Sequence, residues 1–336
     1  VFLADRTSDN LECAVKFVQL NDAKQIGYAQ SEVSCLANCT HFGIIRQFEC
    51  VMKEKTLLLV MEYGSGGDLA KQLKQRAKEN LPFKEHEVGL LLLQIIMAVD
   101  HVHSKRMIHR DIKSANIFLM PTGIVKLGDF GLSKQYDESV SADVGSSFCG
   151  TPYYLAPEIW RRQRYNKKAD MWSIGVVLYE LIAMKRPFSG PAQHQIMDQV
   201  LSGEFDPLPP STAPELQEIV AMLLHKDPTM RPNTQQLLSM KFFKYARSIF
   251  EEIVTVSEVI APADKASITA LLSQPRKQNQ GSVSIDQPVL RPISEPVRFG
   301  GFLLKLGSDR RWKKRYFAII NTGHLRISLT ENPEED

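Results

Sequence analysis

The sequence lacks the cysteine spacing of a structural zinc site. It has 336 residues and five cysteines, of which only Cys35 and Cys39 lie one helical turn apart. No histidine or second cysteine pair completes a metal-binding pattern around them. The odd number of cysteines also argues against a disulfide framework, so we expect free thiols in a reducing compartment.

Long apolar runs and phosphate-binding loops are also missing. The longest apolar run, Val88 to Val99, contains Gln94 and is shorter than the roughly 20 residues that span a bilayer. No secretory signal pattern is present. No GxxxxGK[ST] loop of the Walker type is present either. These observations predict a soluble, cytoplasmic protein that could lie peripherally at a membrane or the cytoskeleton.

The chain has little net charge, +3 in all, which does not argue for a nucleic-acid partner. The charge is unevenly placed, however. Seven basic residues between Arg298 and Phe317 face a single acid, Asp309, and give that stretch a net charge of +6. A short basic hairpin without a recognition helix has no element that could contact the edges of bases, so we expect no nucleic-acid binding there.

Hydrophobic periodicity predicts an α+β protein with a small β-rich lobe followed by a larger helical lobe. Strand, strand, helix and strand patterns follow one another up to about Phe48, with the helix at 22–37, and 57–61 reads as a further, buried strand. From Glu85 onward most of the patterns are helical, at 85–104, 170–183, 192–202, 213–225 and 234–238. A cleft between two such lobes is the natural place for a ligand.

After Phe243 the composition changes. We expect residues 246–297 to be a linker that is largely disordered, with a short helix at about 266–272. Alternating apolar residues then predict three short strands at 302–306, 312–320 and 325–329. The chain begins at Val1 within a strand pattern and ends on acidic residues, so it looks like a piece of a longer protein.

A set of ordered motifs carries the chemistry: His109-Arg110-Asp111, then Asn116, Asp129-Phe130-Gly131 and Ala156-Pro157-Glu158. Together with the upstream Ala14-Val15-Lys16, they resemble the eukaryotic protein kinases over residues 1–245. The resemblance implies a bilobal kinase fold, here truncated before its second strand. It also implies transfer of the γ-phosphate of ATP to Ser/Thr hydroxyls of protein substrates.

The resemblance assigns roles to the residues in these motifs. Asp111 would accept the proton of the substrate hydroxyl, and Lys113 would place a cation beside the transferring phosphoryl group, as in the serine/threonine-specific branch. Asn116 and Asp129 carry hard oxygens suited to Mg²⁺. His109 would be structural and pack beneath Phe130.

A lysine and a carboxylate are expected to hold the ATP phosphates. Lys16 would bind the α- and β-phosphates, positioned by an ion pair with Glu32 on the predicted helix at 22–37. Glu12 and Glu49 are weaker candidates because they lie on expected strands or turns.

The resemblance also implies an adenine site with Met61 as gatekeeper and Glu62 and Gly64 as hinge contacts. Asp68 would lie near the ribose, and the ring would be sandwiched by Val1, Ala14 and Phe118. We interpret the glycine-rich stretch 64–67 as a flexible turn. The family's own glycine-rich loop would precede Val1, so we expect weak or no catalysis from residues 1–336 alone.

The segment from Asp129 to Glu158 corresponds to the activation segment. Ser147 is the expected activating phosphosite, with Arg110 as its partner, whereas Thr151 is expected to line the site of the substrate hydroxyl. The residues around these motifs resemble the NIMA-related (Nek) kinases. That resemblance implies an apolar residue upstream of the target Ser/Thr, and Ala115 and Lys185-Arg186 disfavour a strong preference for basic substrates.

The C-terminal basic stretch resembles the first strands of a pleckstrin-homology (PH) domain over 298–336, an incomplete β-barrel. Lys305, Lys313 and Arg315 would lie on one side of a hairpin and contact a phosphoinositide, or the region would bind a protein partner. A solvated basic edge is the alternative. A pseudokinase scaffold that acts through this PH-like region is the alternative to an active kinase.

Overall fold

The computed structural model describes residues 1–7, 9–135, 150–258, 260–273, 299–306, 312–319 and 325–328. They belong to two compact units, each described here by itself. Unit 1 draws on residues 1–37, 45–63 and 282–336, and unit 2 on residues 38–44 and 64–281. The mixture of sheet and helix that the sequence predicts is confirmed.

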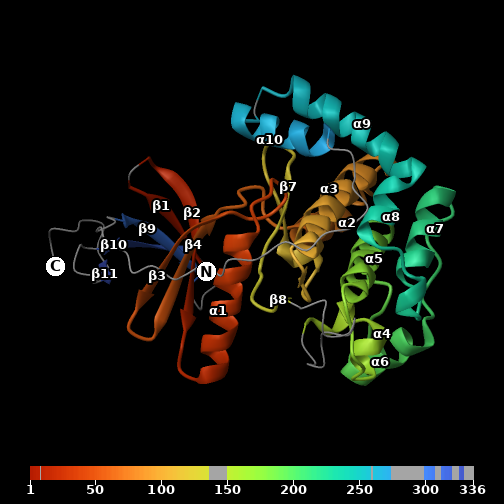
Figure 1. The fold of residues 1–336 in the computed structure, drawn as a ribbon, viewed down its shortest axis with the longest axis horizontal. Coiled ribbons are helices and arrows are strands. Elements are labelled where there is room, and N and C mark those ends of the chain that lie inside the picture. Colours follow the sequence, from red (N-terminus) through yellow and green to blue (C-terminus); the bar gives the residue numbers. More distant parts are fainter. Residues whose placement is uncertain are drawn as a thin grey trace. The chain divides into compact units, whose positions relative to one another are not determined.

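Unit 1 is built on an antiparallel sheet. Its elements are β1 (Phe2–Arg6), β2 (Leu11–Gln19), α1 (Ala23–Asn38), β3 (Gln47–Lys53), β4 (Thr56–Glu62), β9 (Phe299–Leu306), β10 (Trp312–Ile319) and β11 (Leu325–Ser328). The first four strands lie in the order β1-β2-β4-β3 (Figure 1). The strands β9, β10 and β11 pair with one another in an antiparallel meander, and β9 pairs with β1 where Leu3 meets Leu304.

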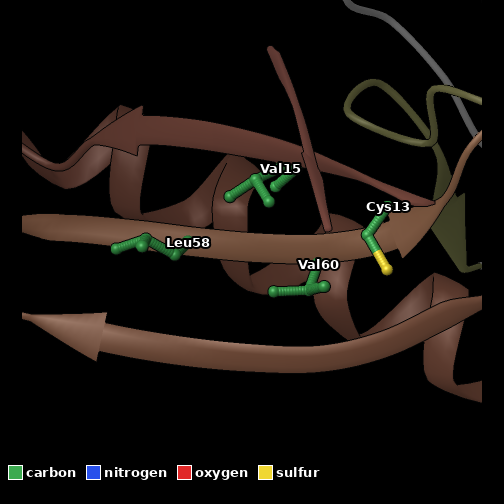
Figure 2. Packing of buried hydrophobic residues seen from close by; sticks show 5 residues of the cluster. Cys13, Val15, Leu58 and Val60 are labelled. Carbon is green, nitrogen blue, oxygen red and sulfur yellow. The ribbon is translucent and has the colours of Figure 1, made fainter. Parts of the chain in front are cut away.

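Both faces of this sheet are apolar, because alternate residues of a strand point to opposite faces. On one face, Cys13 and Val15 of β2 pack with Leu58 and Val60 of β4 (Figure 2). On the other face, the alternate residues Leu57 and Leu59 of β4 pack with Ala29 of α1. Lys16 follows Val15 on β2, so its side chain lies on the face that α1 covers.

Unit 2 is mainly helical. Its elements are α2 (Leu69–Glu79), α3 (Glu85–Ser104), β5 (Met107–Ile108), η1 (Ser114–Asn116), β6 (Ile117–Leu119), β7 (Val125–Leu127), β8 (Lys134–Gln135), η2 (Pro152–Tyr154), α4 (Pro157–Trp160), α5 (Lys168–Ala183), α6 (Gln193–Ser202), α7 (Pro214–Leu223), η3 (Pro228–Met230), α8 (Thr234–Ser239), α9 (Lys241–Val256) and α10 (Pro262–Ser273).

The helices α3 and α5 form the centre of unit 2. Both are buried along most of their length, and they contact each other (Figure 1). Among the described residues, α3 is the one helix long and apolar enough to cross a membrane by length and composition. Most of its side chains are buried against α5, α8 and α9, as in the core helix of a folded domain.

Residues 246–273 correct the expected linker. The helix α10 confirms the short helix expected at about 266–272 and extends it at its N-terminal end. The helix α9 continues to Val256, where disorder was predicted from residue 246 onward. The reason is an apolar stripe at helical spacing in α9, in which Phe250 and Val254 are buried. The Phe250 ring lies 5.9 Å from that of Phe42, and α9 packs against α3. The remaining linker positions, 274–297, lie outside the described residues.

Candidate active site

The carboxylate of Asp111 is the centre of a cluster in unit 2. Asp111 lies in the loop between β5 and η1 and is 7% exposed. Its Oδ2 accepts hydrogen bonds from Lys113 Nζ at 2.6 Å and from Asn116 Nδ2 at 3.0 Å. The hydroxyl of Thr151 donates to the other oxygen, Oδ1, at 3.0 Å and accepts from Lys113 Nζ at 2.9 Å. Four residues that the sequence singled out are thus brought together.

Asp170, at the start of α5, holds the loop that carries Asp111. Its Oδ2 accepts from the backbone N–H of His109 and its Oδ1 from that of Arg110, both at 2.9 Å. The ring of His103 lies 2.8 Å from Oδ2. Burial alone would raise the pKa of Asp170, but the bond from His103 and the other hydrogen bonds and charges around it lower that pKa. The carboxylate therefore stays charged although it is fully buried.

The segment around Asp129 is tied to the same cluster. The N–H of Gly128 donates to the carbonyl of Asn116 at 2.9 Å, so the residue that precedes Asp129 is hydrogen-bonded to the backbone of the other predicted metal ligand. Asp129 has a φ of 60°, a left-handed conformation that is uncommon outside glycine. The next side chain, Phe130, is buried and meets the His109 ring edge-on at 4.7 Å, as expected for a structural histidine.

The donor set at Asn116 and Asp129 fits a hard divalent cation such as Mg²⁺. The side-chain nitrogen of Asn116 donates to Asp111. The side-chain oxygen of Asn116, the atom suited to a cation, therefore lies on the opposite side of the same amide group. Asp129 adds a carboxylate. Oxygen ligands of this kind are the ones that Mg²⁺ prefers.

In unit 1 the expected pair of Lys16 and Glu32 is present. Lys16 Nζ lies 2.7 Å from Glu32 Oε1, and the Glu32 side chain is 4% exposed. Glu32 is carried by α1, on the face of the sheet where Lys16 lies. The weaker candidates lie elsewhere: Glu12 is exposed on β2, and Glu49 is on β3, where burial raises the pKa of its carboxyl.

The adenine-site residues of unit 1 lie on neighbouring strands. Ala14 of β2 is paired with Met61 of β4 in the register of the sheet. The side chain of Glu62 accepts a hydrogen bond from the backbone N–H of Arg46 at 3.1 Å. Val1 is 75% exposed at the start of β1.

In unit 2, the stretch 64–67 forms the expected turn, in which the N–H of Gly67 donates to the carbonyl of Gly64 at 3.0 Å, and Gly64 lies against Phe118. A Cβ on Gly64 would come within 2.8 Å of the Phe118 side chain, and one on Gly66 within 2.5 Å of the Leu119 carbonyl. Two backbone hydrogen bonds also join this stretch to Leu119 of β6. The glycines are required by this close approach.

Asp68, predicted near a ribose, caps the helix α2. Its Oδ1 accepts from the backbone N–H of Lys71 at 2.8 Å. An Asp before a helix is a common N-cap, so this carboxylate has a structural role in the described fold whichever ligand it meets.

A buried network beside the catalytic loop was not predicted. The hydroxyl of Tyr154 lies 2.9 Å from Ser114 Oγ and 2.8 Å from Glu180 Oε1. The acidic residues Glu180 and Asp170 both interrupt α5, an otherwise apolar helix. A carboxylate within such a helix is the sequence signal that could have revealed these positioning groups.

Four predicted site residues lie outside the side chains that the structure describes. Ser147 lies outside the described residues. Lys305, Lys313 and Arg315 belong to β9 and β10, where the structure describes the backbone alone. The register of these strands pairs Lys305 with Lys313.

Comparison with known proteins agrees with this cluster. The family model described as "Protein kinase domain" matches residues 1–243 of this chain. Serine/threonine-protein kinase A of Trypanosoma brucei brucei is 39% identical over 338 residues, which cover 99% of this chain and 78% of that protein. Serine/threonine-protein kinase B of the same organism is also 39% identical, over 99% of this chain and 78% of its own length.

Relatives from animals share the kinase part. Serine/threonine-protein kinase Nek5 of Mus musculus is 35% identical over 75% of this chain and 40% of its own length. Serine/threonine-protein kinase Nek3 of Mus musculus is 38% identical over 62% of this chain. The chain therefore belongs to the protein kinase family, and it is a serine/threonine protein kinase with Nek-family relatives.

Proposed function

We propose that this chain is a NIMA-related kinase that transfers the γ-phosphoryl group of ATP to Ser and Thr hydroxyls of proteins, with residues 1–245 as its kinase domain. The observation that carries the proposal is the Asp111 cluster, in which a carboxylate, a lysine, an asparagine and a threonine hydroxyl converge within hydrogen-bond distance. Phosphoryl transfer depends on such positioning and charge stabilisation more than on covalent chemistry.

Within the cluster each group has a distinct task. Asp111 orients the substrate hydroxyl and accepts its proton, in the position where it now accepts from the hydroxyl of Thr151. Lys113 neutralises charge on the phosphoryl oxygens. Asn116 and Asp129 would hold Mg²⁺, which supplies charge neutralisation at the phosphates when it is bound. In unit 1, Lys16 would bind nucleotide phosphates while Glu32 fixes its side chain.

The test is replacement of Asp111 by Asn in the intact protein, with transfer of labelled phosphate from ATP to a generic protein substrate as the readout. We expect a loss of activity of about 10²- to 10⁴-fold, because the proton acceptor is removed while size and shape are kept. The matched control is Asp198→Asn, an exposed carboxylate on α6, which should leave transfer unchanged. Full activity in Asp111→Asn would contradict the assignment of Asp111, whereas no transfer by the unchanged protein would favour the scaffold alternative.

We further propose that phosphorylation of Ser147 activates the kinase through Arg110. The Nε and Nη2 atoms of Arg110 are buried and find no hydrogen-bond partner among the described residues, while its guanidinium lies 5.3 Å from the Tyr165 ring. A phosphate would supply the missing acceptors. Phosphate mapping of active protein should find Ser147 modified, and Ser147→Ala should lower activity. Thr151 modified in place of Ser147 would contradict this assignment.

For the C-terminal strands we propose a PH-like module that binds phosphoinositides and places the kinase at a membrane. The pairing of Lys305 with Lys313 across β9 and β10 supports it, since clustered cations suit clustered phosphates. Cosedimentation with vesicles that contain phosphoinositides should be lost on replacement of Lys305, Lys313 and Arg315 by Gln. Equal binding by the triple variant would contradict the proposal.

A further inference from the structure

An ion pair and two hydrogen bonds connect the guanidinium of Arg186 to η1, next to Lys113. Its side chain is 43% exposed, and its Nε lies 3.4 Å from Glu180 Oε1. The carboxylate of Glu180 also accepts from the hydroxyl of Tyr154, which lies 2.9 Å from Ser114 Oγ in η1. Ser114 directly follows Lys113, so this chain of contacts connects Arg186 to the segment that carries Asp111.

An aromatic ring fixes the plane of this guanidinium. The Arg186 Cζ lies 4.0 Å from the centroid of the Tyr153 ring, a cation–π geometry. Tyr153 is two residues from Thr151, whose hydroxyl donates to Asp111. A peptide in extended conformation spans about 3.3 Å per residue, so the substrate positions to test against Arg186 are those within about five residues of the acceptor.

Glu180 is not available to a basic substrate residue. Both of its oxygens accept from the Tyr154 hydroxyl, at 2.8 and 2.9 Å, and Arg186 already supplies a cation beside it. The side chain of Glu180 is 7% exposed, so a second cation would have to displace Arg186 to reach it.

The unused donors of Arg186 point to an anion. A guanidinium has five N–H donors, and Nε is the atom in contact with Glu180. Neither Nη donates to another group within the part of the chain that the structure describes. Two such parallel donors match a carboxylate or a phosphate. The neighbouring Lys185, in contrast, is paired with Asp206 at 2.6 Å.

We propose that Arg186 is a specificity-determining residue that binds an anionic side chain of the protein substrate near the phosphoacceptor. The proposal rests on the proposed kinase function and adds to it the class of substrate, a Ser/Thr segment with a nearby carboxylate or phosphate. Tyr153 holds the guanidinium in place, and Arg186 and Tyr154 already occupy the Glu180 carboxylate that a basic residue would otherwise meet.

The test uses the intact protein and peptides that share one Ser acceptor. One position at a time, from five residues before the acceptor to five after it, carries Asp, phosphoserine or Ala. We expect one position at which an anion raises kcat/KM about tenfold over Ala, mainly through a lower KM, since the contact is a charge-assisted hydrogen bond. A preference for phosphoserine over Asp at that position would identify phosphate as the anion, and equal preference a carboxylate.

Variants then separate binding from a structural role. Arg186→Gln should reduce the ratio of anionic to Ala peptide to near one, Arg186→Lys should keep part of it, and the control Lys185→Gln should keep all of it. Three results would overturn the inference: a ratio of anionic to Ala peptide near one in the unchanged protein, a ratio retained in Arg186→Gln, or an equal loss in Lys185→Gln. Phosphate transfer to a generic substrate would still support the kinase function in each case. No transfer to any substrate by the unchanged protein would overturn both.

Discussion

At the scale of single residues, the site depends on a carboxylate that is held by charged and neutral hydrogen-bond donors. Asp111 accepts from Lys113 and Asn116 on one oxygen and from Thr151 on the other. Groups fixed in this way lose little conformational freedom when a substrate arrives. The same arrangement means that the effect of one substitution depends on whether its partner is still present.

The pair of Lys16 and Glu32 provides the first prediction. Lys16→Met and Glu32→Gln should each raise the KM for ATP and lower kcat/KM, because each breaks the 2.7 Å contact that positions the lysine. The double variant should be little worse than Lys16→Met alone, since the pair acts as a unit. Steady-state kinetics on the four proteins measures the coupling. Effects that multiply would contradict it, and Glu12→Gln, an exposed glutamate on β2, is the control.

A second prediction concerns the buried ion pair of Arg231 and Glu158. Two parallel contacts of 2.7 and 2.8 Å join these side chains, and both residues are buried. Arg231→Met leaves the Glu158 carboxylate buried without its counter-charge and should lower the free energy of unfolding by about 3–5 kcal/mol. Urea unfolding followed by tryptophan fluorescence measures this loss.

The control for that pair lies on the surface. Arg247 and Glu251 form an i,i+4 pair on α9 at 3.3 Å, with the glutamate 48% exposed. Arg247→Met should change the free energy of unfolding by less than about 1 kcal/mol. A loss of similar size in both variants would show that the burial of Arg231 is not the cause.

At the scale of elements, α9 joins the described core although the kinase-domain match ends at residue 243. Phe250 is 2% exposed and its ring lies 5.9 Å from that of Phe42. Phe250→Ala should lower the free energy of unfolding by about 3–5 kcal/mol, because a large buried ring is removed. Tyr245→Ala on the same helix, where the ring is 69% exposed, should have little effect. Equal urea midpoints for the two variants would show that α9 is not part of the core.

The elements also show what the sequence could predict. The bounds of α3 agree with those expected from its long apolar pattern, and α5, α6, α7 and α8 begin and end within two residues of the predicted helices. The helix α2 was missed because it is short and mostly polar, and only its N-cap, Asp68, marks it. Most of α9 was assigned to a linker although its apolar stripe can be read from the sequence, because the partners of that stripe, α3 and Phe42, come together only in the fold.

Among site residues, the motifs were sufficient to predict the Asp111 cluster and the partner of Lys16. They did not reveal Glu180 or Tyr154, since a carboxylate and a hydroxyl 26 positions apart form no local pattern. Such contacts arise from tertiary packing, which a single sequence does not display.

At the scale of the whole molecule, buried histidines link stability to pH. His41 and His101 stack with ring centroids 5.0 Å apart in unit 2. Burial, with His101 and Lys126 nearby, lowers the pKa of His41 to about 3. Burial and Lys105 lower that of His101 to about 4, against the opposing effect of Asp100. Both rings are therefore neutral in the folded protein at neutral pH.

The unfolded chain binds protons at these histidines below about pH 6.5, whereas the folded protein does so only near pH 3 to 4. The free energy of unfolding should thus be constant above pH 7 and fall between pH 6.5 and 4. The slope should be about 1.4 kcal/mol per pH unit for each histidine. Urea unfolding at several pH values measures the slope. The slope should decrease by about 1.4 kcal/mol per pH unit in His101→Gln. It should not change in His194→Gln, the control, since His194 is exposed on α6. An unchanged slope in His101→Gln would contradict the prediction.

The hydrogen bonds from the loop to Asp170 should also determine how slowly the loop exchanges its amide hydrogens. The backbone amides of His109 and Arg110 donate to a carboxylate on α5, a helix that is buried over most of its length. Their deuterium uptake should therefore be as slow as that of the α5 backbone, since both must await the same cooperative opening. The loop that carries Asp111 would then keep its shape over many turnovers. Its backbone amide hydrogens would exchange with solvent only when the helix α5 also opens.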